Sequence, residues 1–588
     1  MEKSYQIFDG KVIIHARDRL CDTPEELIKS HLFYEFVSRC VRDLVRRESK
    51  LVGIFEGPNP PDSEIHLLVE TMFFLSKLPA DLVIKVVDGS EHFFRDLNLL
   101  NDFVEYIYNS WRSMQRLIVC DAIDGRYDKR PYRTFNRTVE QLMHIVRSTY
   151  RDIQENITGN HPQIYRQVRA GAEIATIAMP KKMDFPDEEL YRKLDPISVI
   201  RQVLIYPPLI FNAPTNKRTG TFERVYQSPL EKLSIQKDDW LCYPAKVGPL
   251  LIMIYFSKRF FELGFSLANL FELASDQDLA RRPDAIYLYG VPVQDFHSNG
   301  KTETIFYDDP ENDILVAAIP EKNEYGYFGY LKKMALTLHN IKMMKIGRMP
   351  FHGALVNLLL REKGDFTVLL MGDTGAGKSE TLEALRMIGG DVIRDITTIA
   401  DDMGSLQKVD GHILGYGTET GAFVRLDDLQ PGYAFGQIDR TIIMNPNQVN
   451  ARVVLPVTTY QNVICGFPVD FVLYANNYEA VDEAHPIIER FQSAEGAIGV
   501  FREGMVMSKG TTSTTGQVQT YFANIFGPEQ YQAEHEVIAR DYFEQFFKTD
   551  LFVGQMRTQL GIPGKERSGP EEAARMLLET LKNYRPQG

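Results

Sequence analysis

The sequence VLLMGDTGAGKSETL, residues 368–382, joins an apolar run to a glycine-rich turn and then to a helical pattern. Its centre reads Gly-x4-Gly-Lys-Ser, in which the glycines let successive backbone N–H groups turn toward one anion. Lys378 adds a positive charge for the outer phosphates, and the Ser379 hydroxyl can ligate a divalent metal. The stretch therefore predicts a P-loop that binds a nucleotide or another polyphosphate. Its residues are Gly372, Asp373, Thr374, Gly375, Ala376, Gly377, Lys378 and Ser379.

Composition limits the class of protein. The chain has 588 residues, of which 44% are hydrophobic and 25% charged, as in soluble globular proteins of roughly two to four domains. The formal net charge of -13 repels polyanions, so no nucleic-acid or membrane partner is expected, and a phosphate site has to be a local positive pocket. Five scattered cysteines and the lack of a leader-like or membrane-spanning run predict a reducing, cytoplasmic location.

The pattern of apolar residues differs between two parts of the chain. Helical spacing of apolar residues from Thr23 to about Arg47, and again from Val139 to Ile153, predicts a helical N-terminal third. After a charged, proline-punctuated stretch at 180–196, short apolar runs alternate with helical patterns, which indicates a mixed α/β assembly. The expected strands are residues 199–206, 250–255, 285–288, 314–319, 367–371, 441–444 and 471–474, and further helices are expected at 260–273, 529–547 and 570–584.

Four short segments supply charged groups for the surroundings of the P-loop. They are residues 327–333 (YFGYLKK), 350–356 (PFHGALV), 399–402 (IADD) and 450–456 (NARVVLP). With these segments in this order, the chain resembles the phosphoenolpyruvate carboxykinase family. ATP-dependent members of that family carry Tyr-x-Gly-x-x-Lys-Lys, a His nineteen residues after the second Lys, a P-loop, Asp-Asp and Asn-Thr-Arg-x-x-x-Pro. Lys333 and His352 here have the same separation of nineteen residues.

The resemblance implies a site for two metal ions. It implies that Lys333, His352 and Asp402 hold a manganese ion, and that a magnesium ion binds Ser379 of the P-loop. A lysine ligand has to be neutral, which requires a strongly lowered pKa. The neighbouring Lys332 and the charge of the metal itself would both lower it.

The resemblance also implies residues for binding and transfer. The family pattern places Tyr327 against the small-molecule substrate, and Arg452 together with the P-loop Lys378 on the phosphoryl group. Arg425 falls where the family has a phosphate-binding lysine, which keeps the charge. Arg218, in the segment NKRTG, is a candidate for binding a substrate carboxylate, with a solvated basic turn as the alternative. Packing is the alternative for Tyr327, because aromatic residues surround it in the sequence.

The fold implied by the resemblance is a two-lobed carboxykinase-like P-loop fold with mixed sheets, preceded by a mainly helical region. The corresponding domains are 1–190, helical and accessory; 191–345, for the substrate; and 346–588, for the nucleotide and metals. The implied activity interconverts oxaloacetate with phosphoenolpyruvate and CO2, with a nucleotide as phosphoryl partner. ATP is the expected nucleotide, but Ser513 stands where the family's nucleotide lid has an arginine, which leaves GTP or pyrophosphate open.

Two other functions stay open. The P-loop wording and the segment IADD are also similar to HPr kinase/phosphorylase, in which one such aspartate, here Asp401, is the catalytic base. A protein or metabolite kinase is therefore the second hypothesis, and a non-catalytic nucleotide-binding regulator is the third. A kinase has no use for a neutral lysine paired with a histidine on a metal, which favours the carboxykinase. Purely structural alternatives are a core His352, a turn capped by Asp401 and Asp402, and a solvent-exposed Lys332.

Overall fold

The computed structural model describes residues 5–16, 20–121, 131–161, 168–186, 189–218, 222–296, 303–426, 438–509, 515–549 and 551–584. The chain divides into two compact units. The N-terminal unit comprises Met1–Pro180 with Ile200–Tyr206, and the C-terminal unit comprises Lys181–Val199 with Pro207–Gly588. Both combine helices with mixed sheets, so the protein is a mixed α/β protein. None of the helices in the described ranges has the length and apolar character needed to span a bilayer.

The N-terminal unit contains a sheet in addition to the helices that the sequence predicted. Its strands lie in the order β1 (Tyr5–Phe8), β2 (Lys11–Ala16), β3 (Gln115–Asp121), β4 (Ile174–Pro180) and β5 (Ser198–Ile205). The first two residues of β5 belong to the C-terminal unit and the rest of this strand to the N-terminal unit. β2, β3 and β4 are mutually parallel, and their apolar side chains form a buried core with one face of the long helix α6 (Pro131–Thr158). β1 and β2 form a hairpin across Asp9-Gly10, a dipeptide typical of a two-residue hairpin turn, so the sequence carried a local signal for this pair that the prediction of a helical region left out.

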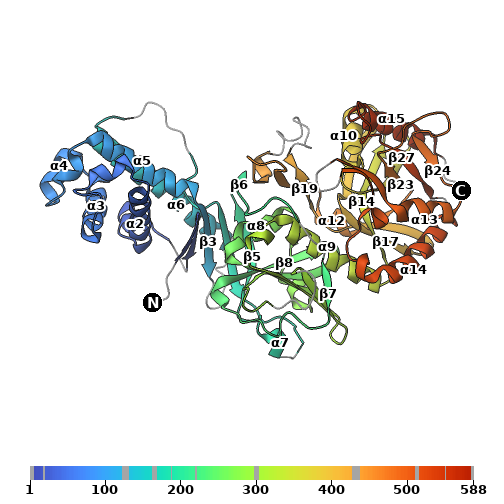
Figure 1. Cartoon of the computed structure of the whole chain (residues 1–588), viewed down its shortest axis with the longest axis horizontal. Coiled ribbons are helices and arrows are strands. Elements are labelled where there is room, and N and C mark those ends of the chain that lie inside the picture. The colour runs from blue at the N-terminus through green and yellow to red at the C-terminus, as the bar shows by residue number, and fades with distance from the viewer. Residues whose placement is uncertain are drawn as a thin grey trace. The chain divides into compact units, whose positions relative to one another are not determined.

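Most helices of this unit lie between β2 and β3. They are α1 (Pro24–Ile28), α2 (His31–Arg46), α3 (Asp62–Leu75), α4 (Ala80–Val86) and α5 (Leu97–Ser113), with short 3-10 helices at Lys50–Ile54 and Glu91–Phe94. The helix predicted from Thr23 to Arg47 is divided, because Ser30 accepts a hydrogen bond from the Phe33 N–H and starts a second helix. The helical pattern predicted at 139–153 lies within α6, and Figure 1 shows α5 and α6 packed side by side.

The first sheet of the C-terminal unit packs against a buried helix. Its strands are, in order, β8 (Trp240–Val247), β9 (Leu250–Ser257), β11 (Ala285–Val291), β13 (Ile314–Pro320), β12 (Ile305–Asp309) and β7 (Glu223–Val225), with β10 (Glu272–Leu273) beside β8. α9 (Phe328–Lys345) packs against β8, β11 and β13 and is buried along most of its length. The helix predicted at 260–273 is shorter than expected: α8 spans Phe261–Ser266, and the chain then enters a 3-10 turn and β10. A four-residue helix, α7 (Glu189–Arg192), precedes this sheet.

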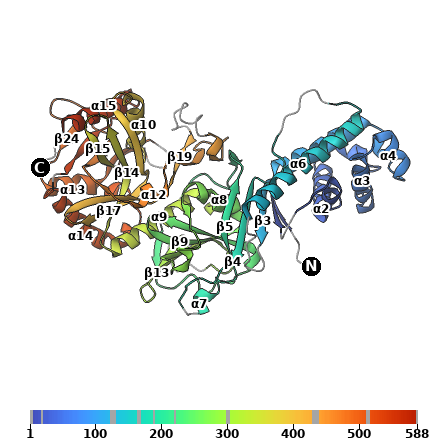
Figure 2. The ribbon, with the colours of Figure 1, turned by 180° about the vertical axis from the view of Figure 1, so that it is seen from behind.

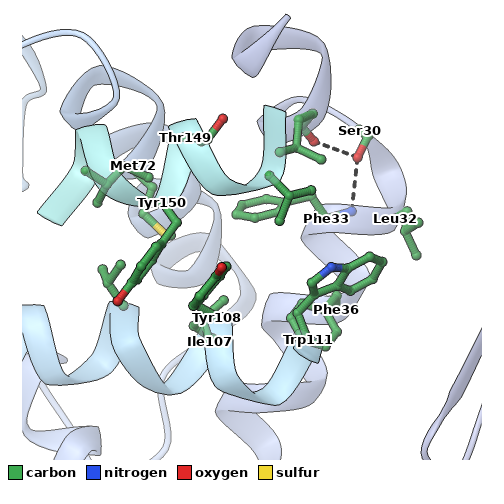
Figure 3. Close-up of a pocket in the computed structure, with 14 residues that line it drawn as sticks. Ser30, Leu32, Phe33, Phe36, Met72, Ile107, Tyr108, Trp111, Thr149 and Tyr150 are labelled. Carbon is green, nitrogen blue, oxygen red and sulfur yellow. Dashed lines mark hydrogen bonds between the residues drawn. The ribbon is translucent and has the colours of Figure 1, made fainter. Parts of the chain in front are cut away.

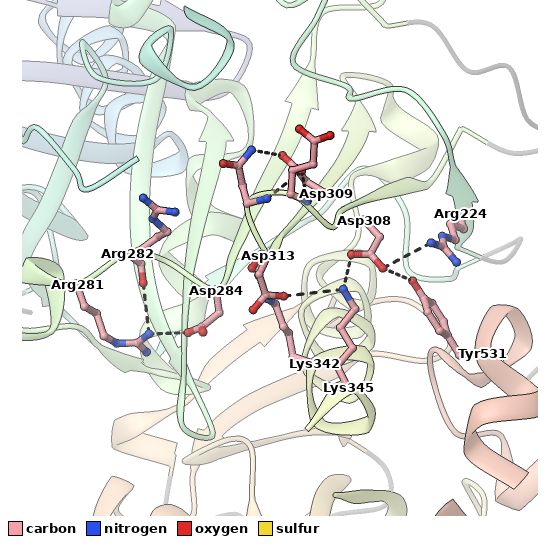
Figure 4. Close-up of polar contacts among 12 residues, drawn as sticks. Arg224, Arg281, Arg282, Asp284, Asp308, Asp309, Asp313, Lys342, Lys345 and Tyr531 are labelled. Atoms are coloured by element: carbon pink, nitrogen blue, oxygen red, sulfur yellow. Dashed lines mark hydrogen bonds and ion pairs between the residues drawn. The ribbon is translucent and has the colours of Figure 1, made fainter. Parts of the chain in front are cut away.

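A buried ionic junction ties this sheet to two helices. The carboxylate of Asp308, on β12, accepts a hydrogen bond of 2.8 Å from the hydroxyl of Tyr531, on α14 (Pro528–Phe546). It also contacts Lys345 at the end of α9, and the Arg224 guanidinium lies 3.6 Å away. Figure 4 shows these side chains converging on Asp308. Because Asp308 is buried, this set of cations and a hydroxyl compensates for the lost hydration of its charge.

The second sheet of the C-terminal unit carries the P-loop. Its strands are, in order, β22 (Phe467–Pro468), β18 (His412–Gly417), β17 (Met403–Val409), β14 (Met349–Leu360), β15 (Gly364–Met371), β23 (Phe471–Asn476), β27 (Phe552–Arg557) and β24 (Ile488–Arg490), with β16 (Ile393–Ala400) also paired to β14. β15, β23 and β27 are parallel and end at one edge. α10 (Lys378–Ile388) and α15 (Ser568–Asn583) pack together over this sheet, as Figure 2 shows.

Smaller elements complete this unit. A third sheet has the order β19 (Gly421–Arg425), β21 (Arg452–Pro456), β20 (Ile442–Met444) and β6 (Leu209–Phe211), and β25 (Met505–Lys509) pairs with β26 (Thr515–Gln519). Among the described residues, this unit also contains the α-helices α12 (Tyr460–Ile464) and α13 (Ala494–Glu503). All seven predicted strands and the two predicted C-terminal helices are present, with ends that differ by a few residues.

Candidate functional site

The P-loop connects β15 to α10 at the common edge of the parallel strands. Gly377 has a φ of 92°, and a Cβ atom there would lie 2.5 Å from the Thr558 hydroxyl oxygen, so only glycine fits. Side chains that follow the neighbouring strands hold the loop carbonyls: the Asn477 amide donates to Gly375 O at 2.9 Å, and the Thr558 hydroxyl donates to Ala376 O at 2.7 Å. The loop is thus fixed before any ligand arrives, and the first N–H groups of α10, which has no side-chain cap, are available to an anion.

Lys378 and Ser379 lie at the start of α10 in different surroundings. The Lys378 ammonium is buried and donates to the carbonyl oxygens of Gly372 and, at 3.0 Å, Asp373. Burial lowers the pKa of Lys378, and the charges of Asp402 and Asp373 oppose this shift. Ser379 is exposed. Lys378 therefore lies folded back onto the loop, within reach of a phosphate bound in it.

His352, on β14, and Asp402, between β16 and β17, are in direct contact beside this loop. The backbone carbonyl of His352 accepts the N–H of Gly372, and the N–H of Gly353 donates to the Asp402 carbonyl, so main-chain bonds hold both residues at the P-loop. The imidazole Nδ1 lies on the carbonyl of Ala523, which can only accept, so Nδ1 carries a proton. Nε2 faces the Asp402 Oδ1 at 2.9 Å. If the ring is neutral, His352 Nε2 and Asp402 Oδ1 face each other with lone pairs. Such a contact is stable only when a proton or a cation lies between the two atoms.

Lys332 occupies the other side of Asp402. Its ammonium lies 2.8 Å from Asp402 Oδ2 and 3.0 Å from Glu419 Oε1, and its side chain is 3% exposed. Burial acts to lower the pKa of Lys332, but the charges of Asp402 and Glu419 outweigh it and raise the pKa. The same ion pair and the bond from His352 hold the pKa of Asp402 well below its usual value in spite of burial. The alternative of a solvent-exposed Lys332 is therefore wrong, and so is that of an Asp402 that only caps a turn.

Glu419 is the member of this group that the sequence did not single out. Burial raises its pKa to about 7, an effect that the Lys332 charge opposes and the Asp402 charge reinforces. The hydroxyl of Thr418 donates to its Oε2 at 2.5 Å. Its position two residues before β19 gave no signal, because the partner that explains it, Lys332, lies on α9, far away in the sequence.

Lys333 differs sharply from its neighbour on the same helix. Burial, and next the charge of Arg218, lower the pKa of Lys333 to about 8, against the opposing charges of Asp402 and Asp373. Lys332 also lowers this pKa, as the sequence predicted, but it contributes less than burial and Arg218. The Lys333 ammonium lies 4.6 Å from the centre of the Phe526 ring, and that ring lies 5.9 Å from the His352 ring. Lys333 therefore lies near the His352–Asp402 pair, with the Phe526 ring as their shared neighbour, and no hydrogen bond or ion pair within the described ranges joins Lys333 to this pair.

A cluster of arginines lies near Lys333. Arg425 on β19 and Arg452 on β21 are directly paired across the two strands, an arrangement of like charges that destabilises a sheet unless an anion compensates. The Arg452 guanidinium lies over the Phe423 ring at 5.5 Å, and its buried Nε has no hydrogen-bond partner among the described residues. Tyr327 packs against Phe423, and burial raises its pKa against the charges of Arg452 and Arg218. The packing alternative for Tyr327 thus holds alongside its place in this cluster.

Arg218 lies over the ring of Phe222 at 5.3 Å, and its charge reaches both Tyr327 and Lys333. Asp401, next to Asp402, has its pKa raised by burial, with Lys332 opposing. The site thus contains a phosphate loop, a histidine–carboxylate pair and a group of cations. Within the described ranges, no set of three or more His, Cys, Asp or Glu side chains is placed to hold a metal. Residues 510–514 of the expected nucleotide lid, including Ser513, lie outside the described residues.

Comparison of the sequence with known family models and with curated proteins finds no match.

Proposed function

We propose that the protein is a phosphoenolpyruvate carboxykinase-like enzyme, which interconverts oxaloacetate with phosphoenolpyruvate and CO2 by transferring a phosphoryl group from or to a nucleotide. The observation that carries this proposal is the contact of His352 Nε2 with Asp402 Oδ1 directly beside the P-loop. A P-loop alone supports any phosphoryl transfer. An imidazole nitrogen facing a low-pKa carboxylate beside the P-loop supports the second cation that enolate chemistry requires.

The donor set fits a transition metal such as Mn2+. His352 Nε2 and Asp402 Oδ1 lie 2.9 Å apart and would both face one bound cation, and Lys333, with its pKa of about 8, becomes neutral at a low energetic cost. Ser379, exposed at the first turn of α10, would hold Mg2+ with the phosphates. When bound, the metal ions would supply positive charge for the enolate oxygen and for the polyphosphate.

The residues of the chain account for the remaining chemistry. Oxaloacetate loses CO2 by cleavage of a carbon–carbon bond, and the electron pair stays on the enolate. The enolate oxygen then attacks the terminal phosphorus of the nucleotide in line, and the bond between this phosphorus and the leaving nucleoside diphosphate breaks. Lys378, Arg425 and Arg452 would neutralise the phosphoryl oxygens, while Tyr327 and Arg218 would hold the substrate carboxylate. The buried Arg452 Nε, which has no hydrogen-bond partner in the described part of the chain, supports an anion at this place.

Carboxylation measures this function directly. Purified protein would be incubated with phosphoenolpyruvate, bicarbonate and Mn2+ against ADP, GDP or phosphate in turn, and oxaloacetate would be followed. We expect oxaloacetate with at least one acceptor, its loss in Lys333→Ala and His352→Ala, and full activity in Lys363→Ala, which changes an exposed lysine. A Lys333→Ala enzyme with wild-type activity would remove the proposed metal site.

A kinase that acts on a hydroxyl is the second candidate, and one observation favours it. Burial raises the pKa of Asp401, which suits a general base better than the low pKa of Asp402. In that case phosphate would move from ATP to a protein or metabolite hydroxyl without any dependence on CO2, and Asp401→Asn would abolish the transfer. Nucleotide binding without turnover in either assay would favour a regulatory protein.

A further inference from the structure

An apolar cavity lies among the helices of the N-terminal unit, and none of the residues that line it is assigned to the proposed function. Its volume is about 80 Å³, and side chains from α1, α2, α3, α5 and α6 line it. Figure 3 shows Tyr108 and Ile107 on α5 and Tyr150 on α6 at this cavity, with Phe33 and Phe36 of α2 beside them. Well-packed protein interiors rarely leave a space larger than one water molecule, so this volume is unusual.

The lining has the chemistry of a site for hydrocarbon. All but two of its residues, Ser30 and Thr149, are aliphatic or aromatic, and the hydroxyl of Ser30 is already bonded to the chain at Leu27 O and Phe33 N. The hydroxyl of Thr149 is buried without a hydrogen-bond partner in the described residues. Two polar groups cannot hold a cluster of waters in place, and an apolar cavity of this kind stays dry or takes up an apolar molecule.

Positive charge is concentrated beside one wall of the cavity. The Tyr108 and Tyr150 rings are stacked at 3.8 Å, and the guanidinium of Arg112 lies 5.7 Å from the centre of the Tyr108 ring. The Nε of Arg112 is buried and has no partner within the described ranges, although its Nη1 bonds Asn109 at 3.1 Å. Burial raises the pKa of Tyr108, and the charges of Arg112, Arg147 and Arg151 all act against this shift. Glu105 is the opposing charge, and it already accepts the hydroxyl of Tyr150.

We propose that this cavity binds the hydrocarbon chain of a small carboxylate, of the kind represented by a medium-chain fatty acid, with the carboxylate on Arg112. The chain would fill the apolar space between α5 and α6. The carboxylate would supply the acceptor that the buried Arg112 Nε lacks. Burial of the methylene groups would give most of the affinity, and the charge would decide which head group is accepted.

Titration of the full-length chain with octanoate and with 1-octanol tests the proposal. Trp111 lines the cavity and is one of two tryptophans, so in a Trp240→Phe variant it is the sole fluorescent reporter. We expect a saturable change in Trp111 emission, and one octanoate per chain by calorimetry on the wild type. Absence of a saturable signal with both compounds, in both measurements, would overturn the proposal.

Two variants locate the ligand. Arg112→Gln should weaken octanoate about tenfold, the effect of one lost charge-assisted hydrogen bond, and leave 1-octanol unchanged. Arg46→Gln, at an exposed arginine of α2, is the matched control and should change neither. Val146→Phe should fill the cavity and abolish binding of both compounds. If Val146→Phe is folded by circular dichroism and still binds octanoate as the wild type does, the cavity is not the binding site. If Arg112→Gln loses affinity for octanoate and 1-octanol equally, the proposed contact between Arg112 and the carboxylate is refuted.

Discussion

Adjacent lysines on α9 should respond to the same substitution with changes in stability of very different size. Lys332→Met removes the ammonium that lies 2.8 Å from Asp402 Oδ2 and 3.0 Å from Glu419 Oε1. The buried carboxylate of Glu419 and the partly buried carboxylate of Asp402 then lack this counter-ion. Removal of one partner from a buried ion pair costs about 3–5 kcal/mol, because the remaining charge stays desolvated. Lys333→Met should change the free energy of unfolding by less than about 1 kcal/mol, since it removes an ammonium that burial already disfavours.

Urea denaturation followed by tryptophan fluorescence measures this difference. Trp240 lies in the core of the C-terminal unit, so a Trp111→Phe background reports that unit alone. Lys408→Met, which breaks a partly exposed pair with Asp541, is the control and should cost at most about 1 kcal/mol.

A second substitution tests the cause of the loss. Glu419→Gln in the Lys332→Met background should recover part of the stability, because it removes one of the two uncompensated charges. Equal losses in Lys332→Met and Lys333→Met, or no recovery by Glu419→Gln, would refute the assignment of Lys332 as the structural cation.

Three further predictions concern the P-loop and the pH dependence of stability. Gly377→Ala, which places a Cβ 2.5 Å from the Thr558 hydroxyl, should abolish pyrophosphate binding in calorimetry, and wild-type affinity would contradict the loop geometry. Burial lowers the pKa of His339 and of His535 to about 4, so between pH 6.5 and 4 the unfolded chain binds protons at these residues that the folded chain does not. The free energy of unfolding should therefore fall as the pH drops from 6.5 to 4, by up to about 1.4 kcal/mol per pH unit for each histidine. A flat profile in urea titrations over that window would refute this. Burial raises the pKa of Asp470 to about 6, so the charge of Asp470 disfavours folding above that pH. Asp470→Asn should therefore stabilise the protein by about 1–2 kcal/mol at pH 8 and have no effect below pH 4. The same gain in stability at both pH values would exclude a charge effect.

The sequence by itself determined the elements whose signals are local. The P-loop lies between a strand and a helix as residues 368–382 predict, because glycines and apolar periodicity act within a few residues of the chain. The strands of the C-terminal unit followed from short apolar runs bounded by turn residues in the same way.

Only the tertiary structure decided the electrostatics of the candidate site. Lys332 and Lys333 are neighbours in one helix, yet two carboxylates from distant segments raise the pKa of the first, while burial and Arg218 lower that of the second. Glu419 enters the site only because the fold brings its carboxylate to Lys332, and the proton on His352 follows from a carbonyl far along the chain. A charge in a low-dielectric interior is governed by whichever groups lie within a few ångströms, and sequence spacing does not record those distances.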